Sequence, residues 1–305
     1  MAVLGMFPGQ GSQEVGMGRA FIESSDQAQA LVQLADKSLG FPLSKIILEG
    51  PIDRLTLTEN AQPAILLIST ICFREASIQI DAAAGHSLGE YSALVAAGCI
   101  SFEDAVQAVH KRGRYMQEAV EPGAGKMVAV MGPTESDIHA VLNGIEQGIA
   151  EIANLNCPGQ TVVAGDVVGI DAFAAEMSKQ GAKIIPLNVS APFHCSLMKP
   201  AAAKLAVDLD AITFQDPAFP IYSNVEAKAV RTGTAARELL KRQVCGSVRW
   251  TDSIQNAVKE GAITDAVEFG AGGVLTKLLK RIDSSVKRHE VANPEGLVAV
   301  KAVLG

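Results

Sequence analysis

The chain has 305 residues, of which 48% are hydrophobic and 19% charged, and its formal net charge is −7. This length can bury a sizeable core as one large domain or two unequal ones, and the acidic balance argues against nucleic acid as the main partner. No apolar run is long enough for a membrane span, and the N-terminus lacks the basic region of a signal peptide, so no membrane partner is expected. The five scattered cysteines have neither disulfide nor metal-ligand spacing, which favours a reducing cytoplasm.

The chain opens with a predicted core strand over Val3–Phe7, followed by a glycine-rich turn at residues 8–13. Backbone N–H groups of such a turn can point at a ligand, and the alternative is a plain connection to the next helix. A phosphate-binding loop is disfavoured because the Lys-Ser/Thr ending is missing. Helices are predicted next over residues 17–23, 28–37 and 64–75, and the last is apolar enough to be internal.

A G-x-S-x-G pattern at residues 85–89 lies between a short predicted strand over residues 78–84 and a helix over residues 90–97. Strand, sharp turn and helix together are typical of a nucleophile elbow, which holds a serine hydroxyl at the C-terminal edge of a sheet. We therefore interpret Ser87 as a candidate nucleophile. The alternative is an ordinary turn bounded by glycines.

The next helix is predicted from Ser101 to about residue 119, because Ser101 can cap it and acidic residues follow in its first turn. Arg112 falls on this helix, either as a functional cation or as part of a solvated basic face. Residues 126–187 then alternate as strand, helix, two strands, helix and strand. This βαββαβ order predicts a ferredoxin-like subdomain.

The chain is expected to return near Ser190 to a larger α/β domain, which residues 1–125 and 188–305 form together. The insertion at residues 126–187 would then be a separate, smaller unit. The later elements predicted for the larger domain are helices over residues 200–210 and 235–243, strands over residues 220–224 and 266–270, and a helix from Val274.

A serine nucleophile needs a base, and the chain offers five histidines. His194 lies in a loop bounded by Pro and Phe where the insertion rejoins the larger domain, which suits a base that reaches into a cleft; a structural role is the alternative. His86 adjoins the serine, so its side chain should point the other way. We expect His110, His139 and His289 to be solvated.

These features give the chain a specific resemblance to the malonyl-CoA:acyl carrier protein transacylases, the malonyl-loading acyltransferases of fatty acid and polyketide synthesis. The resemblance covers nearly the whole chain, and several motifs in the family's order are more specific than any one of them. It implies an α/β fold with a large α/β-hydrolase-like domain and an inserted ferredoxin-like subdomain. The motifs lie at residues 7–13, 60–63, 85–92, 112–117, 156–160, 192–194, 243–250 and 268–270.

The resemblance also implies a role for each matching residue. Ser87 would attack the malonyl thioester, His194 would take its proton, and the backbone carbonyl of Gln243 would orient the imidazole in place of a carboxylate. Backbone N–H groups of Gln10 and Leu88 would form the oxyanion hole. Arg112 would bind the free malonyl carboxylate. The other residues expected to contact the substrate are Met116, Phe193, Asn156 and Gln160.

We therefore predict a cytoplasmic, monomeric acyltransferase that moves malonyl from CoA to the phosphopantetheine thiol of acyl carrier protein through a malonyl-serine ester. No metal or other cofactor is expected, since malonyl-CoA is a substrate and the carrier protein brings the phosphopantetheine. One alternative is a serine thioesterase or esterase, in which water replaces the carrier thiol. Others are a catalytically silent docking module and a transacylase for methylmalonyl or acetyl units.

Overall fold

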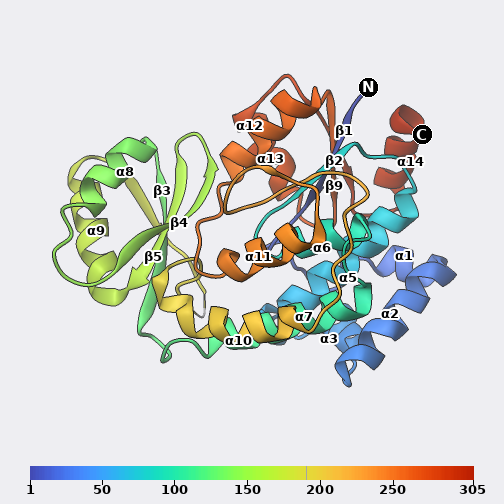
Figure 1. Ribbon diagram of the computed structural model, residues 1–305, viewed down its shortest axis with the longest axis horizontal. Coiled ribbons are helices and arrows are strands. Elements are labelled where there is room, and N and C mark those ends of the chain that lie inside the picture. The colour runs from blue at the N-terminus through green and yellow to red at the C-terminus, as the bar shows by residue number, and fades with distance from the viewer. Residues whose placement is uncertain (190) are drawn as a thin grey trace.

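The structure is a computed structural model that describes residues 1–189 and 191–305, with two sheets set side by side (Figure 1). The predicted return of the chain at Ser190 lies outside the described residues. Within the described ranges, no helix combines the length and apolar character that a membrane crossing requires.

The larger sheet has parallel strands at its centre. Its strands are β1 (Val3–Phe7), β2 (Ala82–Gly85), β7 (Ile221–Tyr222), β8 (Ala229–Val230), β9 (Asp265–Phe269) and β10 (Lys287–Val291). They follow the order β10-β9-β1-β2-β7-β8, and β8 is the strand that runs antiparallel to its neighbour. Phe7 and Gly85 are partners in register, so the turns that follow β1 and β2 leave the sheet at the same edge.

Both faces of this sheet are buried, as the apolar character of β1 requires. Val3 and Phe7 belong to one core, whereas the alternate residues Leu4 and Met6 belong to another on the opposite face. The first core is filled from α1 (Arg19–Ser24), α2 (Asp26–Leu39), α3 (Leu43–Glu49), α4 (Ile52–Thr56), α5 (Thr58–Ala76), α6 (Gly89–Ala96), α7 (Phe102–Gln117), α10 (Lys199–Asp210), α11 (Gly233–Gln243) and α14 (Pro294–Leu304). The second core is filled from α12 (Trp250–Gly261) and α13 (Val274–Ile282).

The smaller sheet belongs to the segment that is inserted between α7 and the short 3-10 helix η1 (Ser196–Met198), which precedes α10. Its elements are β3 (Gly125–Met131), α8 (Glu135–Leu142), β4 (Ala150–Cys157), β5 (Gln160–Asp166), α9 (Val167–Lys179) and β6 (Lys183–Pro186). All neighbours in the order β4-β5-β3-β6 are antiparallel. Val128 and Val130 face α8 and α9, while Met127 and Ala129 on the other face join the core of the larger layer.

One difference from the predicted elements lies at Pro63. The predicted helix begins at residue 64, but α5 begins at Thr58 and runs through the proline. Proline has no N–H to donate to the carbonyl four residues earlier, that of Glu59. The ring of His110 on α7 meets this carbonyl instead, with Nδ1 2.8 Å from the oxygen. His110 is therefore a partner of the backbone, and the prediction that it is solvated was wrong.

His289 is also not the solvated residue that was predicted. It lies on β10, where its Nε2 is 2.9 Å from a carboxylate oxygen of buried Asp265 on β9. The sequence analysis missed this strand because residues 287–290 are an uninterrupted polar run, which matches an exposed tail as well as a strand at a sheet edge. His139 is exposed, as predicted. The other elements that the sequence analysis did not predict are α3, α4, α12, α14, β8 and the 3-10 helix η1.

Candidate active site

Ser87 stands on a tight turn between β2 and α6, in a backbone conformation that few residues adopt. Its φ of 52° lies in the left-handed region, which costs a non-glycine residue about 1–3 kcal/mol. The flanking glycines permit the turn because a Cβ on Gly85 would lie 1.9 Å from the backbone of Gly89, and one on Gly89 would lie 1.9 Å from the carbonyl oxygen of Phe7. The serine therefore sits where β1, β2 and α6 meet.

Asn224, which follows β7, holds the turn in place. Its side-chain oxygen accepts a hydrogen bond from the Ser87 N–H at 2.7 Å, and its side-chain nitrogen donates to the Gly85 carbonyl at 2.7 Å. Asn224 is fully buried, so these bonds are shielded from water. The strained conformation of Ser87 is thus held by hydrogen bonds from Asn224, a residue that follows the neighbouring strand β7.

The structure brings His194 against the serine. Nε2 of His194 lies 2.7 Å from the Ser87 hydroxyl oxygen, while Nδ1 lies 3.0 Å from the Gln243 carbonyl and 3.1 Å from that of Gly246. Carbonyl oxygens only accept, so Nδ1 carries the proton and Nε2 is free to take one from the serine. His194 also has a left-handed φ, of 60°.

The imidazole is held neutral. Burial first, and then the positive charge of Arg112, lower the pKa of His194 to about 3, against the opposing effect of the Gln243 carbonyl. At neutral pH, His194 is therefore an available proton acceptor. No carboxylate is needed to fix its tautomer, because two backbone carbonyls do so.

Arg112 on α7 is buried beside the serine, with 1% of its surface exposed. Its Nη1 donates to Gln62 at 2.7 Å, and its Nη2 donates to Gln243 and to the Ser87 hydroxyl, each at 3.0 Å. The guanidinium also lies over the ring of Tyr91, 5.6 Å from the ring centroid. The solvated alternative for Arg112 is therefore excluded.

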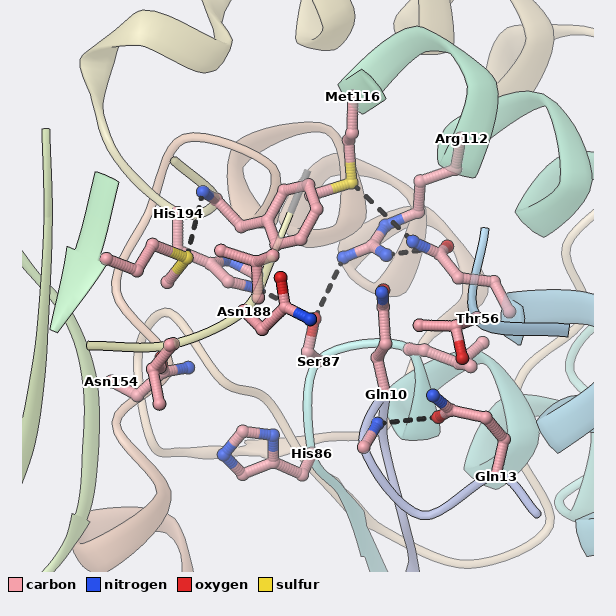
Figure 2. Close-up of a pocket in the computed structure, with 17 residues that line it drawn as sticks. Gln10, Gln13, Thr56, His86, Ser87, Arg112, Met116, Asn154, Asn188 and His194 are labelled. Atoms are coloured by element: carbon pink, nitrogen blue, oxygen red, sulfur yellow. Dashed lines mark hydrogen bonds between the residues drawn. The ribbon is translucent and has the colours of Figure 1, made fainter. Parts of the chain in front are cut away.

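A cavity of about 310 Å³ opens above these three side chains, and the inserted sheet forms part of its wall. Figure 2 shows Ser87, His194 and Arg112 turned toward one another in it, with His86 pointing away from the serine. Gln10 and Leu88 also line the cavity. Within the described residues, neither of their backbone N–H groups donates a hydrogen bond, so both are available to a ligand.

The predicted substrate contacts divide into two groups. Met116 and Phe193 line the cavity. Asn156 does not, because its side-chain oxygen lies 2.8 Å from Nε2 of His86 and so holds that ring. Gln160 is also outside the lining and accepts a hydrogen bond from Arg281 at 3.1 Å. The geometry therefore gives no support to substrate contact by Asn156 or Gln160.

Other polar residues of the site were not singled out from the sequence. Gln62 on α5 holds Arg112, and Asn154, Asn188 and Thr56 present polar groups to the cavity (Figure 2). A signal for Gln62 was present, since it lies in the family motif at residues 60–63. The described residues contain no group of three or more His, Cys, Asp or Glu side chains placed to hold a metal ion.

Comparison with known proteins bears on this site directly. Residues 6–296 match the family described as the acyl transferase domain. A malonyl CoA-acyl carrier protein transacylase of Bacillus subtilis is 45% identical over 297 residues, which span 95% of this chain and 93% of that protein. The chain belongs to the acyl transferase family. The resemblance to malonyl-CoA:acyl carrier protein transacylases is thereby confirmed.

Solved structures of this family have the same fold. The acyl-carrier-protein-S-malonyltransferase of Bartonella henselae superposes with a TM-score of 0.97 at 38% identity, covering all of both chains. A malonyl-transacylase in complex with a type II PKS acyl-carrier protein gives a TM-score of 0.94 at 38% identity over 98% of each chain. A mixed α/β acyl transferase fold is therefore established for this chain, as the sequence predicted.

Proposed function

We propose that this acyl transferase moves malonyl from CoA to the phosphopantetheine thiol of acyl carrier protein, in fatty acid biosynthesis. The observation that carries the proposal is the position of Arg112, whose buried guanidinium lines the cavity 3.0 Å from the hydroxyl of Ser87. A cation so close to a nucleophile selects an acyl group that ends in a carboxylate. The transacylase names of relatives and the carrier-protein complex of a similar enzyme support the same conclusion.

The reaction we propose has two matched halves. The Ser87 oxygen bonds to the thioester carbon while His194 takes its proton, and the carbon–sulfur bond then breaks as His194 returns that proton to the CoA thiolate. In the second half, His194 takes the proton of the carrier thiol as its sulfur bonds to the malonyl ester carbon, and the carbon–oxygen bond of the ester then breaks as His194 returns that proton to the Ser87 oxygen. Neither half requires a metal or another cofactor.

The surrounding groups would stabilise this chemistry. The free N–H groups of Gln10 and Leu88 would bind the oxyanion of each tetrahedral intermediate, since both residues line the cavity beside Ser87. Arg112 would turn from the serine hydroxyl to the malonyl carboxylate, with Met116 and Phe193 enclosing the acyl chain.

We also infer the finer organisation of the fold and the setting of the enzyme. The β4-β5-β3-β6 order supports a ferredoxin-like subdomain at residues 126–187, and the parallel sheet with its serine turn supports an α/β-hydrolase-like domain at residues 1–125 and 188–305. The five unpaired cysteines support a reducing, cytoplasmic setting. We further propose that the enzyme acts as a monomer.

Incubation with malonyl-CoA followed by intact-mass measurement tests the proposed function. We expect a single malonyl adduct, mapped to Ser87 by peptide mass spectrometry, that disappears when holo-carrier protein is added and reappears on the carrier. Steady release of free malonate without carrier protein would indicate a thioesterase. A chain that forms no adduct at any concentration of malonyl-CoA would be a docking module.

Phe193→Ser should relax the discrimination against a branched acyl group. The Phe193 ring lines the cavity next to the base and is 7% exposed, so it would crowd a methyl group on the acyl α-carbon. One methyl group is worth about 1–3 kcal/mol, so the preference for malonyl-CoA over methylmalonyl-CoA should fall by roughly 10- to 200-fold at most. The ratio of kcat/KM for the two substrates measures this, with malonyl loading as the internal reference. An unchanged ratio would show that another side chain sets the limit.

A further inference from the structure

Glu90 is a buried carboxylate three residues after the nucleophile, and the chemistry proposed above does not use it. It lies in the first turn of α6 and is 3% exposed. Its Oε2 accepts two hydrogen bonds, one from the backbone N–H of Asn224 at 3.0 Å and one from the side-chain nitrogen of Gln243 at 2.8 Å. Both donors belong to residues that contact the reacting groups.

These bonds determine which way the Gln243 side-chain amide faces. Its nitrogen also donates to the Ser87 carbonyl at 2.9 Å, so two acceptors lie on that side and only the NH₂ group satisfies both. The amide oxygen must then face the opposite side, where it accepts from Nη2 of Arg112 at 3.0 Å. Reversing the amide would leave a buried oxygen against Glu90 and a buried NH₂ group against the guanidinium.

We propose that Glu90 is a positioning residue for acyl selection, which fixes the Gln243 side-chain amide so that its oxygen holds Arg112 in place for the malonyl carboxylate. This inference rests on the proposed function. The chain of contacts joins α6, α11 and α7 and ends at the atoms that would meet the substrate.

An oxygen acceptor, more than a negative charge, is what this position requires. Burial raises the pKa of Glu90 to about 7, although the two hydrogen bonds and the charge of Arg112 oppose the rise. Arg112 on α7 is the charged group that faces Glu90 from a packed element within the described residues, and Tyr91 beside it is kept neutral because burial raises its pKa. A neutral carboxamide oxygen should therefore serve in the same place.

Three substitutions test the inference through the ratio of kcat/KM for malonyl-CoA to that for acetyl-CoA. Glu90→Gln keeps an acceptor oxygen at the same reach and should keep this ratio within about threefold of wild type. Glu90→Asp keeps the charge but is one methylene too short to reach Gln243, and Glu90→Met removes the acceptor at similar volume. In both, the ratio should fall about 10- to 100-fold, the loss expected for one hydrogen bond to a charged group.

Each outcome decides the inference. The inference is overturned if Glu90→Asp and Glu90→Met keep the wild-type ratio. A fall in the ratio for Glu90→Gln as large as theirs would also overturn it, as would an equal slowing of malonyl and acetyl loading in all three variants. It is also overturned if Glu90→Asp and Glu90→Met do not fold by circular dichroism while Glu90→Gln does, since the acceptor then serves the fold. Glu103→Gln, at an exposed glutamate on α7, is the matched control. Failure of the wild-type enzyme to load malonyl would instead refute the proposed function.

Discussion

Ser87→Ala should abolish both the malonyl adduct and the transfer to carrier protein, whereas His194→Ala should leave a slow reaction. The alanine at 87 removes the atom that would bond to the acyl carbon. Without His194, the hydroxyl has no neutral imidazole at 2.7 Å to take its proton, and the acylation rate should fall by roughly 10³- to 10⁶-fold. Rapid-quench mass measurement of the adduct gives both rates.

The control for this prediction is His139→Ala, because His139 is exposed on α8 and contacts only a surface glutamate at 3.6 Å among the described residues. It should acylate at the wild-type rate. Acylation of the His194 variant at that same rate would show that His194 has a structural role and that the base lies elsewhere.

The parts of the fold that could be predicted are those encoded locally. The period-2 and period-3.6 patterns of residues 126–187 determine the order of strands and helices there, because each element has one face on its own small core. The turn at Ser87 could be predicted for a similar reason. Its two glycines avoid backbone collisions within a few residues along the chain or with the adjacent strand.

The groups that support the site depend on contacts that no local pattern records. Glu90 and Gln243 are 153 positions apart, and Asn224 and Ser87 are 137 apart. From the sequence alone, a glutamate on a helix whose neighbours are unknown is interpreted as a solvated residue. Its hydrogen-bond donors become visible only in the folded structure. The same holds for His110, whose partner is the Glu59 carbonyl. That carbonyl has no helical donor because Pro63, 47 positions before His110, lacks an N–H.

The electrostatics of Arg112 explain why the site should prefer an anionic acyl group. All three hydrogen-bond acceptors of its terminal nitrogens are neutral oxygens, from Gln62, Gln243 and Ser87. Within the described residues it forms no ion pair, and the carboxylate of Glu90 is separated from it by the Gln243 amide. A buried cation with no carboxylate in direct contact is costly, so a carboxylate that enters the cavity gains a partly desolvated partner.

Arg112→Ala should therefore depress malonyl loading strongly while acetyl loading stays level or rises. Losing a partly buried charge-assisted pair costs about 2–5 kcal/mol, or roughly 30-fold to several thousand-fold in kcat/KM for malonyl-CoA. Acetyl-CoA has no carboxylate to lose, and its reaction depends on Ser87 and His194. Removing the cation also ends its lowering of the His194 pKa, which makes the imidazole a better base for any acyl group.

The decisive quantity is the ratio of kcat/KM for malonyl-CoA to that for acetyl-CoA, because the substitution also leaves the buried oxygens of Gln62 and Gln243 without their donor. Any effect of that loss is common to both reactions and cancels in the ratio. Arg114→Ala, two residues along α7 at an exposed position, should leave the ratio unchanged. If Arg112→Ala lowers kcat/KM equally for both substrates, Arg112 supports the fold or binds the CoA moiety, and malonyl selection must come from another residue.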